Sequence, residues 1–233
     1  MSKQDIDVRV ISIGTLSSNP LWGEKAGGAG IRTGHSTTTL IRTGDRAILI
    51  DPGLPEPAIV ARLRERSGIK PEDITHVFLT RFLPECCRGI AAFEHATWWI
   101  GQAEREGVGV PLVTRLQEAA EAGDAELKGA LELDVAILKR CQPAPDNLAD
   151  RVDIFPLHGV SPGLTGVLVA AAATTLVCGD AIPTVEHLER GMVLQSAADL
   201  NKARESFKEA VEIADLLVLG RDNMVVNPLR RGF

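Results

Sequence analysis

The 233-residue chain lacks the features that mark membrane, multidomain and repeat proteins. No apolar run approaches the roughly 20 residues that cross a bilayer, and the first ten residues are too polar for a signal peptide. No stretch rich in Gly, Pro or Ser divides the chain, and no repeat with a period of about 20–50 residues is present. We therefore expect one domain over residues 1–233, without a membrane partner and located in the cytoplasm.

Clustered positive charge is missing as well. The chain carries 25 Lys and Arg against 31 Asp and Glu, and its formal charge is −6. Because nucleic-acid binding needs a concentrated basic face, we expect no nucleic-acid partner. Hydrophobic residues make up 45% of the chain and are spread along its whole length, which excludes disorder and provides enough material for a sizeable core.

The spacings typical of metal-binding motifs are also absent. The four cysteines form no C-x-x-C pair, so the sequence offers neither a zinc ribbon nor a thioredoxin-type motif, and we expect reduced thiols. No two histidines stand at a spacing typical of metal ligands. The histidines are His35, His76, His95, His158 and His187.

Hydrophobic patterning predicts strands and helices in an order that repeats. Strands are expected over residues 7–13, 37–43, 46–50, 76–80, 96–100, 152–156, 166–171, 174–178 and 216–219. Helices are expected over residues 57–67 and 197–214, after the loop that follows residue 80 and through Ala92, and over 112–139 as one or two surface helices. Strands followed by a helix, twice over, indicate two mixed sheets with helices outside. The Ala-, Glu- and Leu-rich segment predicts a helical insertion at about residues 107–143.

Several of these segments carry a resemblance to a known family. They are AILIDPG at 47–53, HVFLT at 76–80, SPGLTGV at 161–167, LVCGDA at 176–181 and ADLLVLG at 214–220. In order and spacing they resemble the metallo-β-lactamase superfamily, which includes glyoxalase II and lactonases. The resemblance covers roughly residues 7 to 225. It implies an α+β fold, a metallo-β-lactamase-like αββα four-layer sandwich of two mixed β-sheets flanked by helices.

The resemblance also implies a dinuclear metal site, but most ligand positions are substituted. Five positions that hold histidine in the family are Arg81, Leu83, Cys86, Val160 and Arg221 in this chain. The aspartate of the H-x-H-x-D-H motif corresponds to Glu85, and the bridging aspartate is retained as Asp180. Leucine and valine offer no lone pair, and arginine is a permanent cation that repels a divalent metal.

We expect the two arginines to take the place of the metal ions. Without a cation, Glu85 and Asp180 would lie buried and uncompensated, and guanidinium groups at Arg81 and Arg221 can pair with them. This predicts an altered or inactive hydrolase homologue without a cofactor. Its pocket would bind a small anionic molecule through Arg81, Arg221 and Glu85.

Three alternatives stay open at this stage. A single zinc or other divalent metal on Glu85, Cys86 and Asp180 would make the protein a hydrolase of an ester, lactone or thioester bond. The same reaction without metal would use His158 as a base, with Asp180 as the other catalytic residue. Alternatively, the helical segment 112–139 forms the contact of a homo-oligomer.

Overall fold

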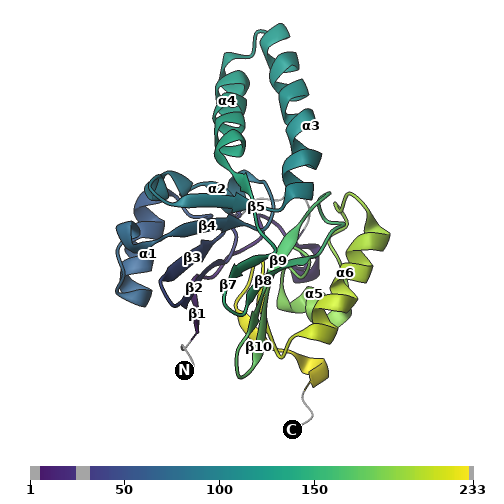
Figure 1. Ribbon diagram of the computed structural model, residues 1–233. Helices are drawn as coiled ribbons and strands as arrows, with labels where there is room; N and C mark the ends of the chain where they lie inside the picture. The colour runs from purple at the N-terminus through teal and green to yellow at the C-terminus, as the bar shows by residue number, and fades with distance from the viewer. Residues whose placement is uncertain (1–5, 25–31, 231–233) are drawn as a thin grey trace.

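Two β-sheets pack face to face in the computed structural model, which describes residues 6–24 and 32–230 (Figure 1). The first sheet contains, in spatial order, β1 (Asp7–Ser12), β2 (Thr38–Thr43), β3 (Arg46–Ile50), β4 (His76–Leu79), β5 (Thr97–Ile100) and β6 (Gln142–Pro143). Its first three strands are antiparallel, and β3 to β6 run parallel.

The second sheet has the order β12-β11-β10-β9-β8-β7. Its strands are β7 (Asn147–Ala149), β8 (Val152–Pro156), β9 (Thr165–Ala170), β10 (Thr174–Gly179), β11 (Leu216–Leu219) and β12 (Met224–Val226). Only the pair β10 and β11 is parallel among the described strands of this sheet. Both sheets are therefore mixed, as expected.

The described residues form six α-helices. They are α1 (Glu56–Ser67), α2 (Pro84–Cys87), α3 (Gln102–Glu121), α4 (Ala125–Arg140), α5 (Val185–Arg190) and α6 (Leu200–Ile213). In Figure 1, α1 lies outside the first sheet, and α5 and α6 lie outside the second. This arrangement confirms the predicted α+β, four-layer αββα sandwich. Short 3-10 helices occur at Pro20–Trp22, Pro71–Asp73, Ile90–Phe93 and Pro228–Arg230.

Local sequence signals set the ends of the outer helices. Helix α1 ends at Gly68, which adopts φ +74° and donates its N–H to the carbonyl of Arg64. Helix α6 begins after Asp199, whose carboxylate accepts the N–H groups of Asn201 and Lys202. These caps satisfy backbone groups that a helix end leaves unpaired.

The core has three apolar clusters, one between the sheets and one under the helices of each side. Strand β4 shows how one strand serves two of them, since Val77 and Leu79 pack under the helices while Phe78 faces the second sheet. Both faces of a central parallel strand are buried, so its sequence is continuously apolar. This explains why the HVFL run predicts a strand without alternation.

Helices α3 and α4 form a hairpin that projects from the sandwich (Figure 1). The first helix begins at Gln102, before the predicted insertion limit of 107 and well before the predicted helix start at 112. The sequence predicts a later helix start because Gly107, Gly109 and Pro111 are poor helix formers. The helix tolerates Gly107 because a Cβ there would lie 2.6 Å from the Cβ of Pro162, so the glycine permits close packing.

Four elements were not predicted from the sequence: β6, β7, β12 and α5. The three strands have two or three residues each and α5 has six, which is too short for a hydrophobic period to show. Within the described residues, no helix is long and apolar enough to cross a membrane.

Candidate functional site

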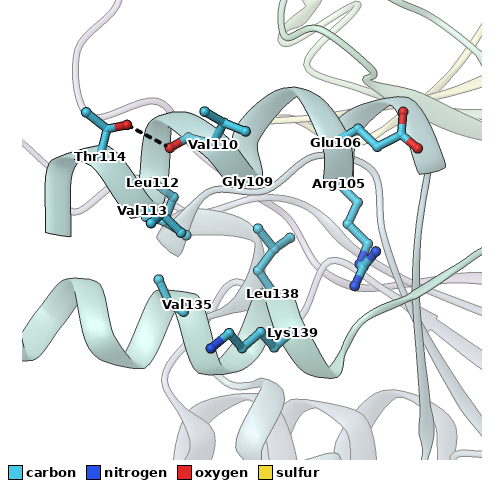
Figure 2. Close-up of a pocket in the computed structure, with 10 residues that line it drawn as sticks. All are labelled: Arg105, Glu106, Gly109, Val110, Leu112, Val113, Thr114, Val135, Leu138 and Lys139. Carbon is cyan, nitrogen blue, oxygen red and sulfur yellow. Dashed lines mark hydrogen bonds between the residues drawn. The ribbon is translucent and has the colours of Figure 1, made fainter. Parts of the chain in front are cut away.

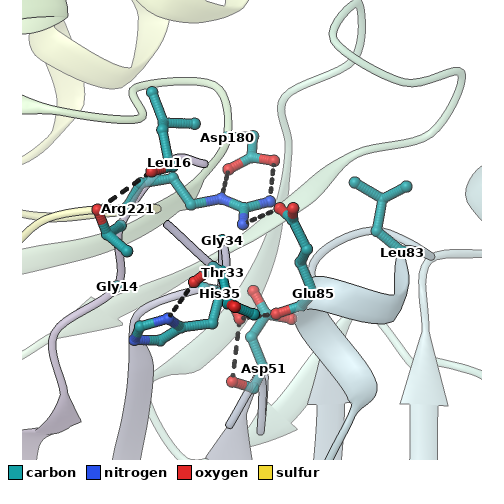
Figure 3. A network of polar contacts seen from close by, with 12 residues as sticks. Gly14, Leu16, Thr33, Gly34, His35, Asp51, Leu83, Glu85, Asp180 and Arg221 are labelled. Atoms are coloured by element: carbon teal, nitrogen blue, oxygen red, sulfur yellow. Dashed lines mark hydrogen bonds and ion pairs between the residues drawn. The ribbon is translucent and has the colours of Figure 1, made fainter. Parts of the chain in front are cut away.

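An ionic cluster lies where the two sheets meet, at the carboxyl ends of β4, β10 and β11. Arg221 donates from Nε to Oδ1 of Asp180 at 2.6 Å and from Nη2 to Oδ2 at 2.8 Å. Its Nη1 also donates to Oε2 of Glu85. Arg81 completes the cluster with a 3.1 Å bond from Nη1 to Oδ2 of Asp180. Figure 3 shows Arg221 placed between the Asp180 and Glu85 carboxylates.

Strand ends on different sheets bring these residues together. Arg81 and Glu85 belong to the segment after β4, Asp180 follows β10, and Arg221 follows β11. The ends of β10 and β11 approach closely at Gly220, because a Cβ there would lie 2.3 Å from the carbonyl oxygen of Gly179. Only glycine permits that approach, which places Asp180 beside Arg221.

The cluster is unevenly buried. The side chains of Arg221 and Asp180 are 1% and 4% exposed, whereas those of Arg81 and Glu85 are 15% and 32% exposed. Burial alone would raise the pKa of Asp180, but the charges and hydrogen bonds of Arg221 and Arg81 outweigh it, so the pKa lies well below its usual value. Burial alone would lower the pKa of Arg221, and the charge of Asp180 reverses that effect. Both groups are therefore ionised at neutral pH.

The residues present do not fit the metal centre that the fold family implies. A guanidinium lies between the two carboxylates, and its N–H groups already use oxygens that would hold a metal. Leu83 precedes α2 with an apolar side chain, and Val160 packs in the core under α6. In the ranges 6–24 and 32–230, no three His, Cys, Asp or Glu side chains are grouped so that they could hold a metal ion.

Cys86, one of the three residues of the hypothetical residual metal site, is buried on α2. Burial, and then the negative charge of Asp51, raise the pKa of the Cys86 thiol well above its usual value. A neutral thiol is a poor metal ligand and a poor nucleophile. Glu85 and Asp180 from the same predicted set are both bound to Arg221.

His158, the predicted base, follows β8 and is half-buried. Its backbone carbonyl accepts the hydroxyl of Ser206 at 2.7 Å, which ties this turn to α6. In the described part of the chain, no hydrogen bond or ion pair joins the His158 ring to the ionic cluster. The catalytic roles proposed for His158 and Asp180 stay predictions.

Asp51 is a buried acid beside the cluster that was not among the site residues predicted from the sequence. Its Oδ1 and Oδ2 accept the N–H and hydroxyl of Thr80 at 2.9 and 2.6 Å. Its backbone adopts φ +49°, a left-handed conformation that is uncommon outside glycine. Burial raises the pKa of Asp51 to about 7, and the charge of Asp180 adds to the effect. The available signal was an aspartate directly after an apolar strand.

His187 on α5 is a second buried titratable group that sequence reasoning missed. Its Nδ1 lies 2.9 Å from the hydroxyl of Thr184, which donates its own proton to Glu186 at 2.6 Å. Nδ1 is therefore the donor and Nε2 the unprotonated nitrogen. Burial lowers the pKa of His187, and the charge of Asp180 acts in the opposite direction. Helix α5 is too short for its sequence to have indicated this placement.

Solved structures share this architecture at low sequence identity. A Thermotoga maritima protein classed as a metallo-beta-lactamase is 19% identical, with a TM-score of 0.67 over 95% of this chain and 99% of that chain. The hydrolase AbOPH of the beta-lactamase superfamily is 16% identical, with a TM-score of 0.64 over 97% and 91%. The dizinc quorum-quenching lactonase AidC is 19% identical, with a TM-score of 0.60 over 76% and 67%. These similarities concern the fold.

Sequence comparison gives a shorter match. Residues 31–80, which include β2, β3 and β4, match the family model of the metallo-beta-lactamase superfamily. No curated protein matches the chain. The matched segment contains the strand that is followed by Asp51 and the strand that precedes Arg81. The four-layer sandwich and this matched segment are thus both similar to the metallo-beta-lactamase superfamily.

Proposed function

We propose that this protein is a superfamily member in which an arginine–carboxylate cluster replaces the metal centre. It would bind a small anionic molecule and would not carry out metal-dependent hydrolysis. The observation that carries the proposal is the position of Arg221, whose three nitrogens bond to Asp180 and Glu85. A permanent cation at this point neutralises the carboxylates and opposes entry of a divalent ion.

Arg81 is the group that supports anion binding. Only its Nη1 is bonded to Asp180, and its buried Nε has no hydrogen-bond partner among the described residues. A buried donor without a partner is costly, and an anionic oxygen would satisfy it. Arg81 and Glu85 are also the more exposed members of the cluster, so a ligand would reach them first.

Metal content and anion binding test this proposal together. Purified protein, after incubation with zinc or manganese and desalting, should hold well below one metal per chain, and its melting temperature should not change with a chelator. Phosphate or acetate should shift backbone amide signals near Arg81 in wild type, and the shifts should be lost in Arg81→Gln. Arg62→Gln is the matched control, because Arg62 forms an exposed ion pair with Glu65. Stoichiometric metal would contradict the metal-free site, and shifts that persist in Arg81→Gln would contradict the anion site.

The competing function is hydrolysis of an ester, lactone or thioester bond. The fold shared with lactonases favours it, and so does the neutral imidazole of His187 within electrostatic reach of Asp180. A screen of these three substrate classes separates the two functions. If hydrolysis is found, its loss in Asp180→Ala would place it at this site. Comparison of His187→Ala with His158→Ala would then identify the base.

The cysteines support a cytoplasmic location as part of the proposal. All four are free and buried thiols: Cys86, Cys87, Cys141 and Cys178. Free thiols are typical of reducing compartments. Detection of the protein in a cytosolic fraction, with four titratable thiols after unfolding, would test this location.

A further inference from the structure

The hairpin of α3 and α4 contains an apolar cleft that is separate from the ionic cluster. Its volume is about 560 Å³, which lies within the range of roughly 300–1,000 Å³ typical of small-molecule sites. Five of the ten residues that line it carry aliphatic side chains. They are Val110, Leu112, Val113, Val135 and Leu138.

Two cations lie at one end of this cleft. Arg105 and Lys139 are near the base of the hairpin, and Figure 2 shows the Arg105 guanidinium on one side of Leu138 and the Lys139 ammonium on the other, toward Val135. Neither cation forms an ion pair with a carboxylate in the part of the chain that the structure describes, and the Nε of Arg105 is buried without a hydrogen-bond partner. The neighbouring Arg140 is different, because its guanidinium lies over Trp98 and bonds to the carbonyl of Glu94.

The other polar groups at the cleft are already engaged. The carboxylate of Glu106 accepts the amide of Gln102 at 2.8 Å and points away from Arg105 in Figure 2. The hydroxyl of Thr114 donates to the carbonyl of Val110 within the same helix at 3.1 Å. The side-chain donors that remain free at the cleft are therefore those of Arg105 and Lys139.

We propose that this cleft binds an amphipathic anion with an unbranched apolar chain, such as a medium-chain carboxylate. The chain would lie between the two helices, where it would cover Val113 and Val135 and be removed from water. The carboxylate would accept hydrogen bonds from Arg105 and Lys139 at the base. A neutral or cationic amphiphile of the same length would leave these cations without a partner.

Gly109 provides a way to close the cleft without disturbing the fold. A Cβ at Gly109 would meet only Leu138 Cδ2, at 3.9 Å, so Gly109→Leu places a side chain in the cleft. Gly129 on α4 is the matched control, because a Cβ there would meet nothing within 4 Å and the residue does not line the cleft. Both substitutions remove a helical glycine, so their effects on helix stability should be alike.

Calorimetric titration of the full chain with decanoate, 1-decanol and decylamine, below their micelle concentrations, tests the proposal. Decanoate should bind once per chain, at least about tenfold more tightly than decanol, and decylamine should not bind. Gly109→Leu should abolish decanoate binding, and Gly129→Leu should keep it. Arg105→Gln with Lys139→Gln should weaken decanoate about tenfold and leave decanol unchanged.

Four results would overturn the proposal: no decanoate binding, equal binding of decanoate and decanol, binding that survives Gly109→Leu, or loss of binding in Gly129→Leu. A fifth result would be a dimer in analytical ultracentrifugation that does not bind decanoate and that Gly109→Leu dissociates. The cleft would then be occupied by a second copy of the chain. If circular dichroism shows that Gly109→Leu is unfolded, Val135→Phe fills the same cleft from α4 and replaces it in each comparison.

Discussion

Arg221 holds Asp180 through a two-point contact in which each carboxylate oxygen accepts one N–H of the same guanidinium, at 2.6 and 2.8 Å. Removal of Arg221 would leave Asp180 with the single bond from Arg81 in a buried site. We therefore expect Arg221→Met to lower the free energy of unfolding by about 3–5 kcal/mol, measured by urea denaturation at pH 7.

Two variants provide the comparison for Arg221. Arg62→Met breaks an exposed pair with Glu65 and should change the free energy of unfolding by less than about 1 kcal/mol. The double variant Arg221→Met with Asp180→Leu leaves no buried acid behind and should recover part of the loss. Equal destabilisation by Arg221→Met and Arg62→Met would show that the contact between Arg221 and Asp180 does not stabilise the fold as a buried ion pair.

Asp51 should make stability fall as the pH rises. Burial raises its folded-state pKa to about 7, above the value of roughly 3.9 for an unfolded aspartate. The folded chain thus holds a proton between these pH values that the unfolded chain has lost. The stability that the protonated group confers is complete below about pH 4 and is lost as the pH rises to about 7.

The variant Asp51→Asn isolates this effect. Asparagine tolerates the left-handed backbone at this position and does not titrate, so the stability of the variant relative to wild type should rise between pH 5 and pH 8. Urea denaturation at several pH values measures it. His187 titrates in both proteins, and its contribution therefore cancels. A difference that does not change with pH would contradict the raised pKa of Asp51.

Asp180 should show the opposite dependence on pH. Its pKa is held below the unfolded value by Arg221 and Arg81 against the effect of burial, so its stabilising contribution is present above the unfolded pKa and is lost as the pH falls below it. Wild type should therefore lose more stability than Asp180→Asn between pH 5 and pH 3, measured by the same denaturation. An equal loss of unfolding free energy in both proteins would show that Asp180 does not contribute to destabilisation by acid.

Glu104 anchors the helical hairpin to the sandwich. Its fully buried carboxylate accepts the N–H of Phe82 at 2.9 Å, the hydroxyl of Ser161 at 2.7 Å and the N–H of Gly163 at 3.0 Å. Glu104→Ala leaves three donors unpaired and should cost about 3 kcal/mol or more of unfolding free energy. Glu104→Gln should cost less, because the amide retains one acceptor oxygen.

The exposed Glu118 on the same helix is the control for Glu104, and Glu118→Ala should be nearly neutral. Limited proteolysis provides a second measurement, since a released hairpin should be cut faster in Glu104→Ala than in wild type. If Glu104→Ala and Glu118→Ala unfold at the same urea concentration, the anchoring role is wrong.

Gly34 leaves space for the carboxylate of Glu85. A Cβ at position 34 would lie 2.6 Å from Oε1 of Glu85, and the flexible carboxylate would have to move away. We expect Gly34→Ala to weaken the contact between Glu85 and Arg221 and to lower stability by about 1 kcal/mol. In a Glu85→Ala background the same substitution should cost less, and additive losses would contradict this coupling.

The sequence by itself determined the architecture. Apolar runs such as HVFL at residues 76–79, turns such as Thr43-Gly44-Asp45 and the end of α1 at Gly68 depend on neighbours in the chain, so their patterns predict the elements. The order of these elements then predicts the two mixed sheets. The elements that were not predicted have only two to six residues. The start of α3 was predicted too late, because contact with Pro162 outweighs the low helix propensity there.

Only the tertiary structure decided how the site is built. The resemblance to a known family implied that Arg81, Glu85, Asp180 and Arg221 lie in one region. Asp180 and Arg221 are 41 residues apart in the chain, and their two-point contact depends on how closely the ends of β10 and β11 approach at Gly220. The burial of Asp51 and the approach of His187 to Asp180 depend on packing between distant segments. Burial and charge act through space and not along the chain. For this reason no sequence pattern indicates the environments of Asp51 and His187, whereas the strands of the fold do have such patterns.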